Sequence, residues 1–305
     1  MTWHAVRAAG ESVAATKALL ADASVRTWLR LSVLVLFVGT LITPFLVDFN
    51  NSSVALASLE GTDTAALLVV TALVFVLFLC VGTVFEFVFI DALRGESVRL
   101  VAGSERRFHP GMQVFALRLV LFVVAGGSVL VAAISLPTPW AIAAGVVLVS
   151  LLLLLDRLTV GFVVPIMLVG GCSLAAGWRT FAPTLGAQWR EYLLYLLVAG
   201  VLWLAIAIVG GLVSALFALG LLVPFGTLGV AVSEVLFTQG LSEAVVTQAV
   251  LGTLALPYLF VFFVFVLLIH VPLIAYLRYI ELFVLGDTIE RHDPIPQLRT
   301  AIRRG

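Results

Sequence analysis

Two adjacent ionisable residues, Asp156 and Arg157, interrupt one of the longest apolar stretches of this sequence. No charged residue occurs between Arg118 and Asp156. Ionisable side chains at membrane depth are energetically costly, and they are therefore candidates for functional sites. Because neighbouring residues of a helix point about 100° apart, Asp156 and Arg157 cannot pair with each other. Each of these two side chains needs a partner of its own.

A proline-containing turn predicts a partner for Asp156. Pro137-Thr138-Pro139 divides the apolar stretch, and Arg118 and Asp156 lie at similar distances before and after this turn. On two antiparallel helices joined there, both side chains reach nearly the same depth, so we predict an Arg118–Asp156 ion pair. One interpretation of this pair is structural, because it would fix the packing of the helices. The other is a proton or substrate relay, and Arg157 has a further interpretation as a ligand of inner-leaflet lipid phosphate.

A second layer of charges lies at the ends of other apolar stretches. Glu86 ends one stretch, Glu191 begins another, and Arg278 and Glu281 lie together near the end of the last. Opposite signs at equal depth predict a polar network that anchors and packs the helices, and a cavity for an amphiphile or an ion is the alternative. The candidate intramembrane network comprises Glu86, Arg118, Asp156, Arg157, Glu191, Arg278 and Glu281.

The segment 94–107 is rich in arginine and predicts an interaction with lipid headgroups. It carries Arg94, Arg99, Arg106 and Arg107 against two glutamates. Basic residues near an anionic membrane surface contribute roughly 1 kcal/mol each to binding. A second interpretation, compatible with the first, is that these arginines only set the orientation of the chain. The expected partner is the lipid bilayer, with anionic lipids at the cytoplasmic face, and the sequence identifies no protein partner.

Patterns typical of catalysis do not occur in the sequence. The histidines His4, His109, His270 and His292 are isolated, and the chain has no His-Glu-x-x-His spacing. It also has no Gly-x-Ser-x-Gly elbow and no glycine-rich phosphate loop. We therefore predict no catalytic residue, no metal site, no cofactor and no enzymatic activity. The net charge of zero gives no footprint for nucleic acid.

The composition predicts an all-α fold, a polytopic bundle of about six transmembrane helices in a single integral membrane domain. Hydrophobic residues make up 62% of the chain and charged residues 11%, which excludes a water-soluble globule. A span needs about 20 residues, with a range of roughly 17–25. The predicted spans are 30–48, 65–90, 115–136, 140–170, 191–217 and 252–283. The fourth span is either one long helix or a helix broken at Asp156-Arg157.

The basic residues predict the orientation of the chain. The expected loops 48–64, 137–139 and 224–250 contain no lysine or arginine, so the positive-inside rule places the other loops and both termini in the cytoplasm. An even number of spans agrees with this orientation. Residues 3–20 have an amphipathic pattern and are expected to lie along the membrane surface, and residues 287–305 are expected to form a cytoplasmic tail.

Several strings of residues resemble an uncharacterised archaeal family of multi-pass membrane proteins. They are Phe162-Val163-Val164-Pro165-Ile166-Met167 followed by Ala176-Gly177-Trp178-Arg179, Glu86-Phe87-Val88-Phe89 with Ala92-Leu93-Arg94, Trp28-Leu29-Arg30-Leu31, and Arg278-Tyr279 through Leu285-Gly286-Asp287. The resemblance covers nearly the whole chain. More distantly, the chain is similar to the membrane portion of bacterial glycerophosphoryl diester phosphodiesterases, without their soluble catalytic barrel. The resemblance implies a membrane module and no transferable activity. The basic residues are sixteen arginines and one lysine, a bias that predicts a prokaryotic source and hence a prokaryotic cell membrane.

Two functional hypotheses follow from these features. The first is a non-enzymatic integral membrane module that acts in lipid interaction, membrane organisation or complex assembly. The second is a transporter or permease for a small solute or a lipid, in which Asp156, Arg157 and Glu86 line the path. The off-centre position of the charges favours the first hypothesis, because transporters place their binding sites near the bilayer midplane.

Overall fold

A computed structural model describes residues 4–21, 23–38, 62–95, 100–135 and 137–304. These residues form helices joined by short turns, and no strand occurs among them. The predicted all-α fold is therefore confirmed. The chain divides into two compact units, each of which is described by itself. Unit 1 comprises residues 1–195 and 274–305, and unit 2 comprises residues 196–273.

Unit 1 begins with two short helices, α1 (His4–Ala21) and α2 (Val25–Phe37). The predicted amphipathic segment 3–20 corresponds to α1. Ser24 caps α2 because its side chain accepts a hydrogen bond from the amide of Thr27. Only the first part of the predicted span 30–48 is described, because residues 39–61 lie outside the described ranges.

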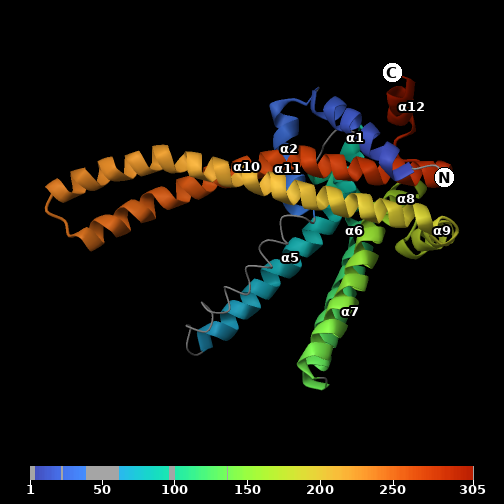
Figure 1. Ribbon diagram of the computed structural model, residues 1–305, viewed down its shortest axis with the longest axis horizontal. Coiled ribbons are helices and arrows are strands. Elements are labelled where there is room, and N and C mark those ends of the chain that lie inside the picture. Colours follow the sequence, from blue (N-terminus) through green and yellow to red (C-terminus); the bar gives the residue numbers. More distant parts are fainter. Residues whose placement is uncertain (1–3, 22, 39–61, 96–99, 136, 305) are drawn as a thin grey trace. The chain divides into compact units, whose positions relative to one another are not determined.

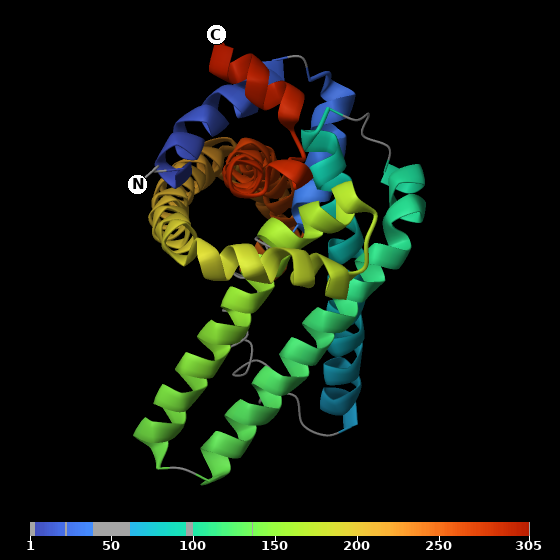
Figure 2. The same cartoon turned by 90° about the vertical axis from the view of Figure 1, so that its right-hand side faces the viewer.

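Three longer helices of unit 1 follow: α5 (Thr62–Leu93), α6 (Leu100–Ser135) and α7 (Thr138–Leu158). Helices α6 and α7 form an antiparallel hairpin, and α5 packs against α6 (Figures 1 and 2). The α6–α7 turn falls at the predicted prolines, where Pro137 precedes α7 and Pro139 lies in its first turn. Because α6 starts at Leu100, it includes much of the basic segment that precedes the predicted span.

The segment 140–170 is not broken at Asp156-Arg157. Helix α7 runs through both residues and continues into a π-helical turn, Thr159–Val163, and then into α8 (Val164–Gly170). Gly171 ends α8 with a φ of 58°, a left-handed conformation that glycine adopts readily. Short π-turns within helices are often found at functional sites, and this π-turn directly follows Asp156 and Arg157.

The rest of unit 1 consists of α9 (Leu174–Ala187), the start of α10 (Trp189–Thr238), the end of α11 (Glu243–Thr288), a short 3-10 turn (Glu290–His292) and α12 (Pro296–Arg304). Its core is aromatic. Phe162 of the π-turn stacks on Phe181 of α9, with ring centroids 5.3 Å apart, and meets Tyr192 and Tyr195 of α10 edge-on. The segment 287–305, which is expected to form a cytoplasmic tail, contains the helix α12.

Unit 2 is a helical hairpin made of the remainder of α10 and α11. The two helices pack through the stacked rings of Phe217 in α10 and Phe265 in α11. Tyr258 of α11 also contacts α10, because its hydroxyl donates to the carbonyl of Ala218 over 3.1 Å. The prediction of a loop at 224–250 is wrong. Most of this segment is helical, because α10 continues to Thr238 and α11 begins at Glu243. The actual turn is short and contains Gly240 with a φ of 77°.

Five helical segments of the described chain are long and apolar enough to cross a membrane. They are Val69–Leu93, Leu100–Ala132, Thr138–Gly170, Trp189–Thr238 and Glu243–Thr288. They correspond to five of the six predicted spans. Many of their large apolar side chains are exposed, including Leu73, Val120 and Leu153. Exposed apolar surface on this scale is typical of proteins that interact with a membrane or with other proteins.

Candidate functional site

The predicted pair between Arg118 of α6 and Asp156 of α7 is present. Arg118 Nε donates to Asp156 Oδ1 over 2.7 Å, and Arg118 Nη2 donates to Asp156 Oδ2 over 3.3 Å. The hairpin produces this two-pronged contact because both residues lie at the same distance from its turn. The Asp156 side chain keeps 31% of its surface exposed, against 12% for Arg118, so the carboxylate is the more accessible partner.

Arg278 of α11 bridges two buried glutamates. Its Nη2 lies 2.6 Å from Glu86 Oε2 of α5, and its Nη1 lies 2.8 Å from Glu281 Oε2, one turn further along α11. Both glutamate side chains are only 1% exposed. Carboxylates this deeply buried require charged partners, because an unpaired buried charge is strongly destabilising.

Arg157 completes the network by pairing with Glu281. The two residues form an ion pair, and the hydroxyl of Tyr195 donates to Glu281 Oε1 over 3.1 Å. Gly161 in the π-turn lies against the Glu281 carboxylate, where a Cβ atom would be only 3.2 Å from it. Asp156 and Arg157 therefore find separate partners on different helices, as their divergent directions predict.

These six side chains form an alternating series that we call the ladder: Asp156, Arg118, Glu86, Arg278, Glu281 and Arg157. It holds three acidic and three basic groups and is neutral as a whole. Its ends are neighbours in the sequence, so the series returns to the helix from which it starts. The ladder joins α5, α6, α7 and α11 and contains six of the seven predicted network residues.

One contact of the ladder is incomplete. Arg118 Nη2 lies 3.8 Å from Glu86 Oε1, which is too long for a hydrogen bond. Glu86 Oε1 is buried and has no hydrogen-bond partner within the described part of the chain. Glu191, the seventh predicted residue, is not part of the ladder, and its Oε2 is also buried without a partner among the described residues.

A cavity of about 430 Å³ opens beside the Arg118–Asp156 pair. Its walls come from α2, α5, α6 and α7, all within unit 1. They are mainly aromatic and aliphatic, with Phe37, Phe75, Phe78 and Phe122 as the largest side chains. The polar groups in the lining are Arg118 and Asp156, so one end of an otherwise apolar cavity carries an ion pair. Pockets that bind small molecules typically measure about 300–1,000 Å³ and have such a lining.

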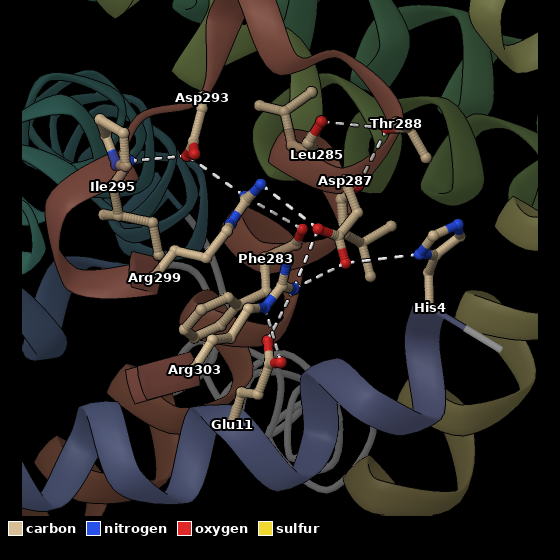
Figure 3. Close-up of polar contacts among 12 residues, drawn as sticks. His4, Glu11, Phe283, Leu285, Asp287, Thr288, Asp293, Ile295, Arg299 and Arg303 are labelled. Carbon is tan, nitrogen blue, oxygen red and sulfur yellow. Dashed lines mark hydrogen bonds and ion pairs between the residues drawn. The ribbon is translucent and has the colours of Figure 1, made fainter. Parts of the chain in front are cut away.

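A second ionic cluster joins the two ends of the chain (Figure 3). Asp287 at the end of α11 pairs with Arg7 of α1 at 2.7 Å and with Arg303 of α12 at 2.9 Å. Arg303 also donates to both oxygens of Glu11, and these hydrogen bonds raise the pKa of its guanidinium. Arg299 packs over Gly286, at a position where a Cβ atom would collide with the guanidinium. We call Glu11, Arg7, Asp287, Arg299 and Arg303 the terminal cluster.

Two arginines of the basic segment 94–107 contact residues in other parts of the protein. Arg107 donates to both oxygens of Asp91, over 2.8 and 3.1 Å. Arg94 donates to the carbonyl of Pro294 and also contacts Asp91. These two arginines thus have protein partners, which weakens their interpretation as headgroup ligands. Arg106 is exposed and retains that interpretation, and Arg99 lies outside the described residues.

Sequence reasoning missed Tyr195, Asp91 and Asp287. Tyr195 carries no sequence signal, because a tyrosine near the start of an apolar helix is usual at a membrane interface. Asp287 pairs with a residue 280 positions away, and no local pattern encodes such a contact. Asp91 lies five residues after Glu86, on a different face of the same helix, so the Glu86 position gives no signal for it.

Comparison with known proteins gives one match. Residues 3–295 match the family of unknown function DUF7544, which is nearly the whole chain. The chain belongs to this family. No curated protein and no solved structure matches the chain. The family assignment agrees with the expectation of an uncharacterised family, and the similarity to archaeal proteins and to phosphodiesterase membrane portions stays a prediction.

Proposed function

We propose that this member of the DUF7544 family is a non-enzymatic, multi-pass module of a prokaryotic cell membrane that holds a lipid in the cavity beside Arg118 and Asp156. The observation that carries the proposal is the composition of that cavity. Its aromatic and aliphatic walls suit a hydrocarbon chain, and its single polar end suits a headgroup. The termini and the exposed Arg106 face the cytoplasm in this proposal, where Arg106 meets anionic lipid.

The ladder supports a binding role because it fixes the helices around the cavity. Arg118 is held by Asp156 and lies beside Glu86, while Glu86 is held by Arg278. Each arginine of the ladder is paired with a carboxylate, so rearranging one helix would separate buried opposite charges. A site with such fixed walls retains a ligand and does not need to change its shape.

Lipid retention by the purified protein tests this function. The full-length protein is extracted from its membrane in mild detergent and measured by native mass spectrometry. We expect one lipid molecule per chain. Ala125→Trp fills the cavity and should remove the lipid, whereas Val124→Trp, on the neighbouring exposed position outside the cavity lining, should retain it. Equal retention by the two variants, or no lipid in the wild-type protein, would contradict the proposal.

A second candidate function is transport of a small solute or a lipid. The π-turn that follows Asp156 and Arg157 favours it, because irregular turns of this kind accompany functional sites. The charges Asp156, Arg157 and Glu86 would then line the path. Reconstitution into vesicles separates the two functions. Substrate-dependent flux that is lost in Asp156→Asn supports transport, and lipid binding without flux supports the binding module.

A further inference from the structure

We propose that the ligand of the cavity is a neutral amphiphile with a free hydroxyl group, which donates to Asp156 and allows Arg118 to complete its contact with Glu86. This inference rests on the proposed function and names the chemical class of the lipid. Its basis is the set of contacts at the polar end of the cavity, where three charged groups share too few hydrogen bonds.

The charges at this end disfavour a charged headgroup. A phosphate or a carboxylate would be repelled by Asp156 and Glu86, and the arginines that could attract it are already engaged, Arg118 by Asp156 and Arg278 by Glu86. A cationic headgroup would compete with Arg118 for Asp156. Since the ladder is neutral as a whole, a neutral headgroup adds no uncompensated charge to a buried site.

The hydrogen bonds favour a donor over an acceptor. Arg118 holds Asp156 by a short bond from Nε, at 2.7 Å, and by a longer one from Nη2, at 3.3 Å. A ligand hydroxyl that donates to Asp156 Oδ2 competes with the longer bond and leaves the shorter one in place. Hydroxyl-to-carboxylate hydrogen bonds are short and about twice as strong as neutral ones.

Glu86 Oε1 lies close enough to accept a hydrogen bond from Arg118 Nη2 once Nη2 turns away from Asp156. Arg118 Nη2 needs to move less than an ångström toward Glu86 Oε1, which is buried, 3.8 Å away and lacks a hydrogen bond in the described structure. A buried acceptor without a partner is destabilising, and its satisfaction favours the bound state. Binding therefore exchanges one long hydrogen bond for two good ones.

The apolar walls determine where the hydrocarbon part lies. From Arg118 to Ala125 on α6, and from Asp156 back to Val149 on α7, the cavity follows about two turns of each helix, or roughly 10 Å. Phe75 and Phe122, with ring centroids 5.3 Å apart, lie along this path. The hydroxyl lies at the ladder and the chain extends along α6 and α7 toward the proline turn.

Matched pairs of lipids test the inference on the purified protein in nanodiscs of dioleoylphosphatidylcholine. The probes are dioleoylglycerol and its acetate, and geranylgeraniol and its acetate, so within each pair the hydroxyl donor is replaced by an ester that can only accept. We expect each alcohol to bind about tenfold or more tightly than its acetate, because the acetate leaves the charge-assisted bond unmade. Preference for one alcohol over the other distinguishes a glycerolipid from an isoprenoid source.

Two controls keep the inference separate from the proposed function. Dioleoylphosphatidic acid, which is anionic and has no alcohol group, is the anionic probe, and its selective binding would overturn the inference while leaving lipid binding intact. Equal binding of alcohols and acetates would also overturn it. Asp156→Asn should reduce the preference for the alcohol, and the probe comparison on the wild-type protein remains decisive where this variant folds poorly. Binding of no probe and no lipid would contradict the proposed function itself.

Discussion

The ladder and the terminal cluster are built from the same residue types, arginine and carboxylate, in different surroundings. In the ladder, Glu86 and Glu281 are almost completely buried. In the terminal cluster, the Asp287 side chain is also buried, at 4% exposed, but the side chains of its partners Arg7 and Arg303 are 50% and 31% exposed. Water and salt screen exposed charges. A buried charge that loses its partner is neither solvated nor screened, which strongly destabilises the fold. Similar contacts therefore have very different consequences when one partner is removed.

The largest effect is expected at Arg278, which is the only charged residue that contacts both Glu86 and Glu281 in the described structure. Arg278→Met leaves both buried glutamates with weaker partners and should lower the free energy of unfolding by about 3–5 kcal/mol. Thermal unfolding in detergent, followed by circular dichroism, measures this change. A loss below about 1 kcal/mol would show that the ladder is not buried from solvent.

A smaller effect is expected at the cavity end of the ladder. Asp156→Asn keeps an acceptor for Arg118 and removes the charge, so we expect a loss of about 1–3 kcal/mol. The double variant with Arg118→Met tests the pair directly, because two residues in contact show non-additive effects. Strict additivity of the two single variants would contradict the predicted pairing.

Arg303→Met should have a still smaller effect. Exposed ion pairs typically contribute about 0–1 kcal/mol, and salt screens them. We expect the effect of Arg303→Met to shrink between low and high salt, and the effect of Arg278→Met to stay the same. If salt changed the stability effects of the two variants equally, the ladder and the terminal cluster would not differ in their exposure to solvent.

The smallest effect is expected from the protonation of His292, which follows α11 in the 3-10 turn. Burial lowers the pKa of this imidazole, and Arg291 lowers it further. The folded state therefore binds a proton less readily than the unfolded state, whose histidine pKa is about 6.5. Stability should fall slightly as the pH decreases below that value, and His292→Gln should remove this part of the pH dependence of the melting temperature.

The sequence predicted the parts of the site that local geometry encodes. The distance of Arg118 and Asp156 from the proline turn fixed their depth, and the divergent directions of Asp156 and Arg157 required separate partners. The ends of the apolar stretches placed Glu86, Arg278 and Glu281 in one layer. These inferences need only the rise of a helix and the rule that buried charges are paired.

Other features depend on contacts that no local pattern encodes. The segment 224–250 lies between two predicted spans and contains no basic residue, which predicts a loop outside the membrane. Its leucine, valine and alanine residues instead continue the helix past Pro224. The arginine-rich pattern of 94–107 predicts Arg107 at the membrane surface, whereas the structure pairs it with Asp91 on the preceding helix. The cavity depends on four helices meeting and could not be derived from any one of them.

Photo-crosslinking can locate the lipid that we propose between α5, α6 and α7, with its polar end at Arg118 and Asp156. A dioleoylglycerol analogue with a diazirine in one acyl chain is incorporated into nanodiscs with the full-length protein, and the labelled peptides are identified by mass spectrometry. We expect labels within 118–125 and 149–156 that disappear in Ala125→Trp and persist in Val124→Trp. Labels confined to residues 196–273, or unchanged by Ala125→Trp, would contradict it.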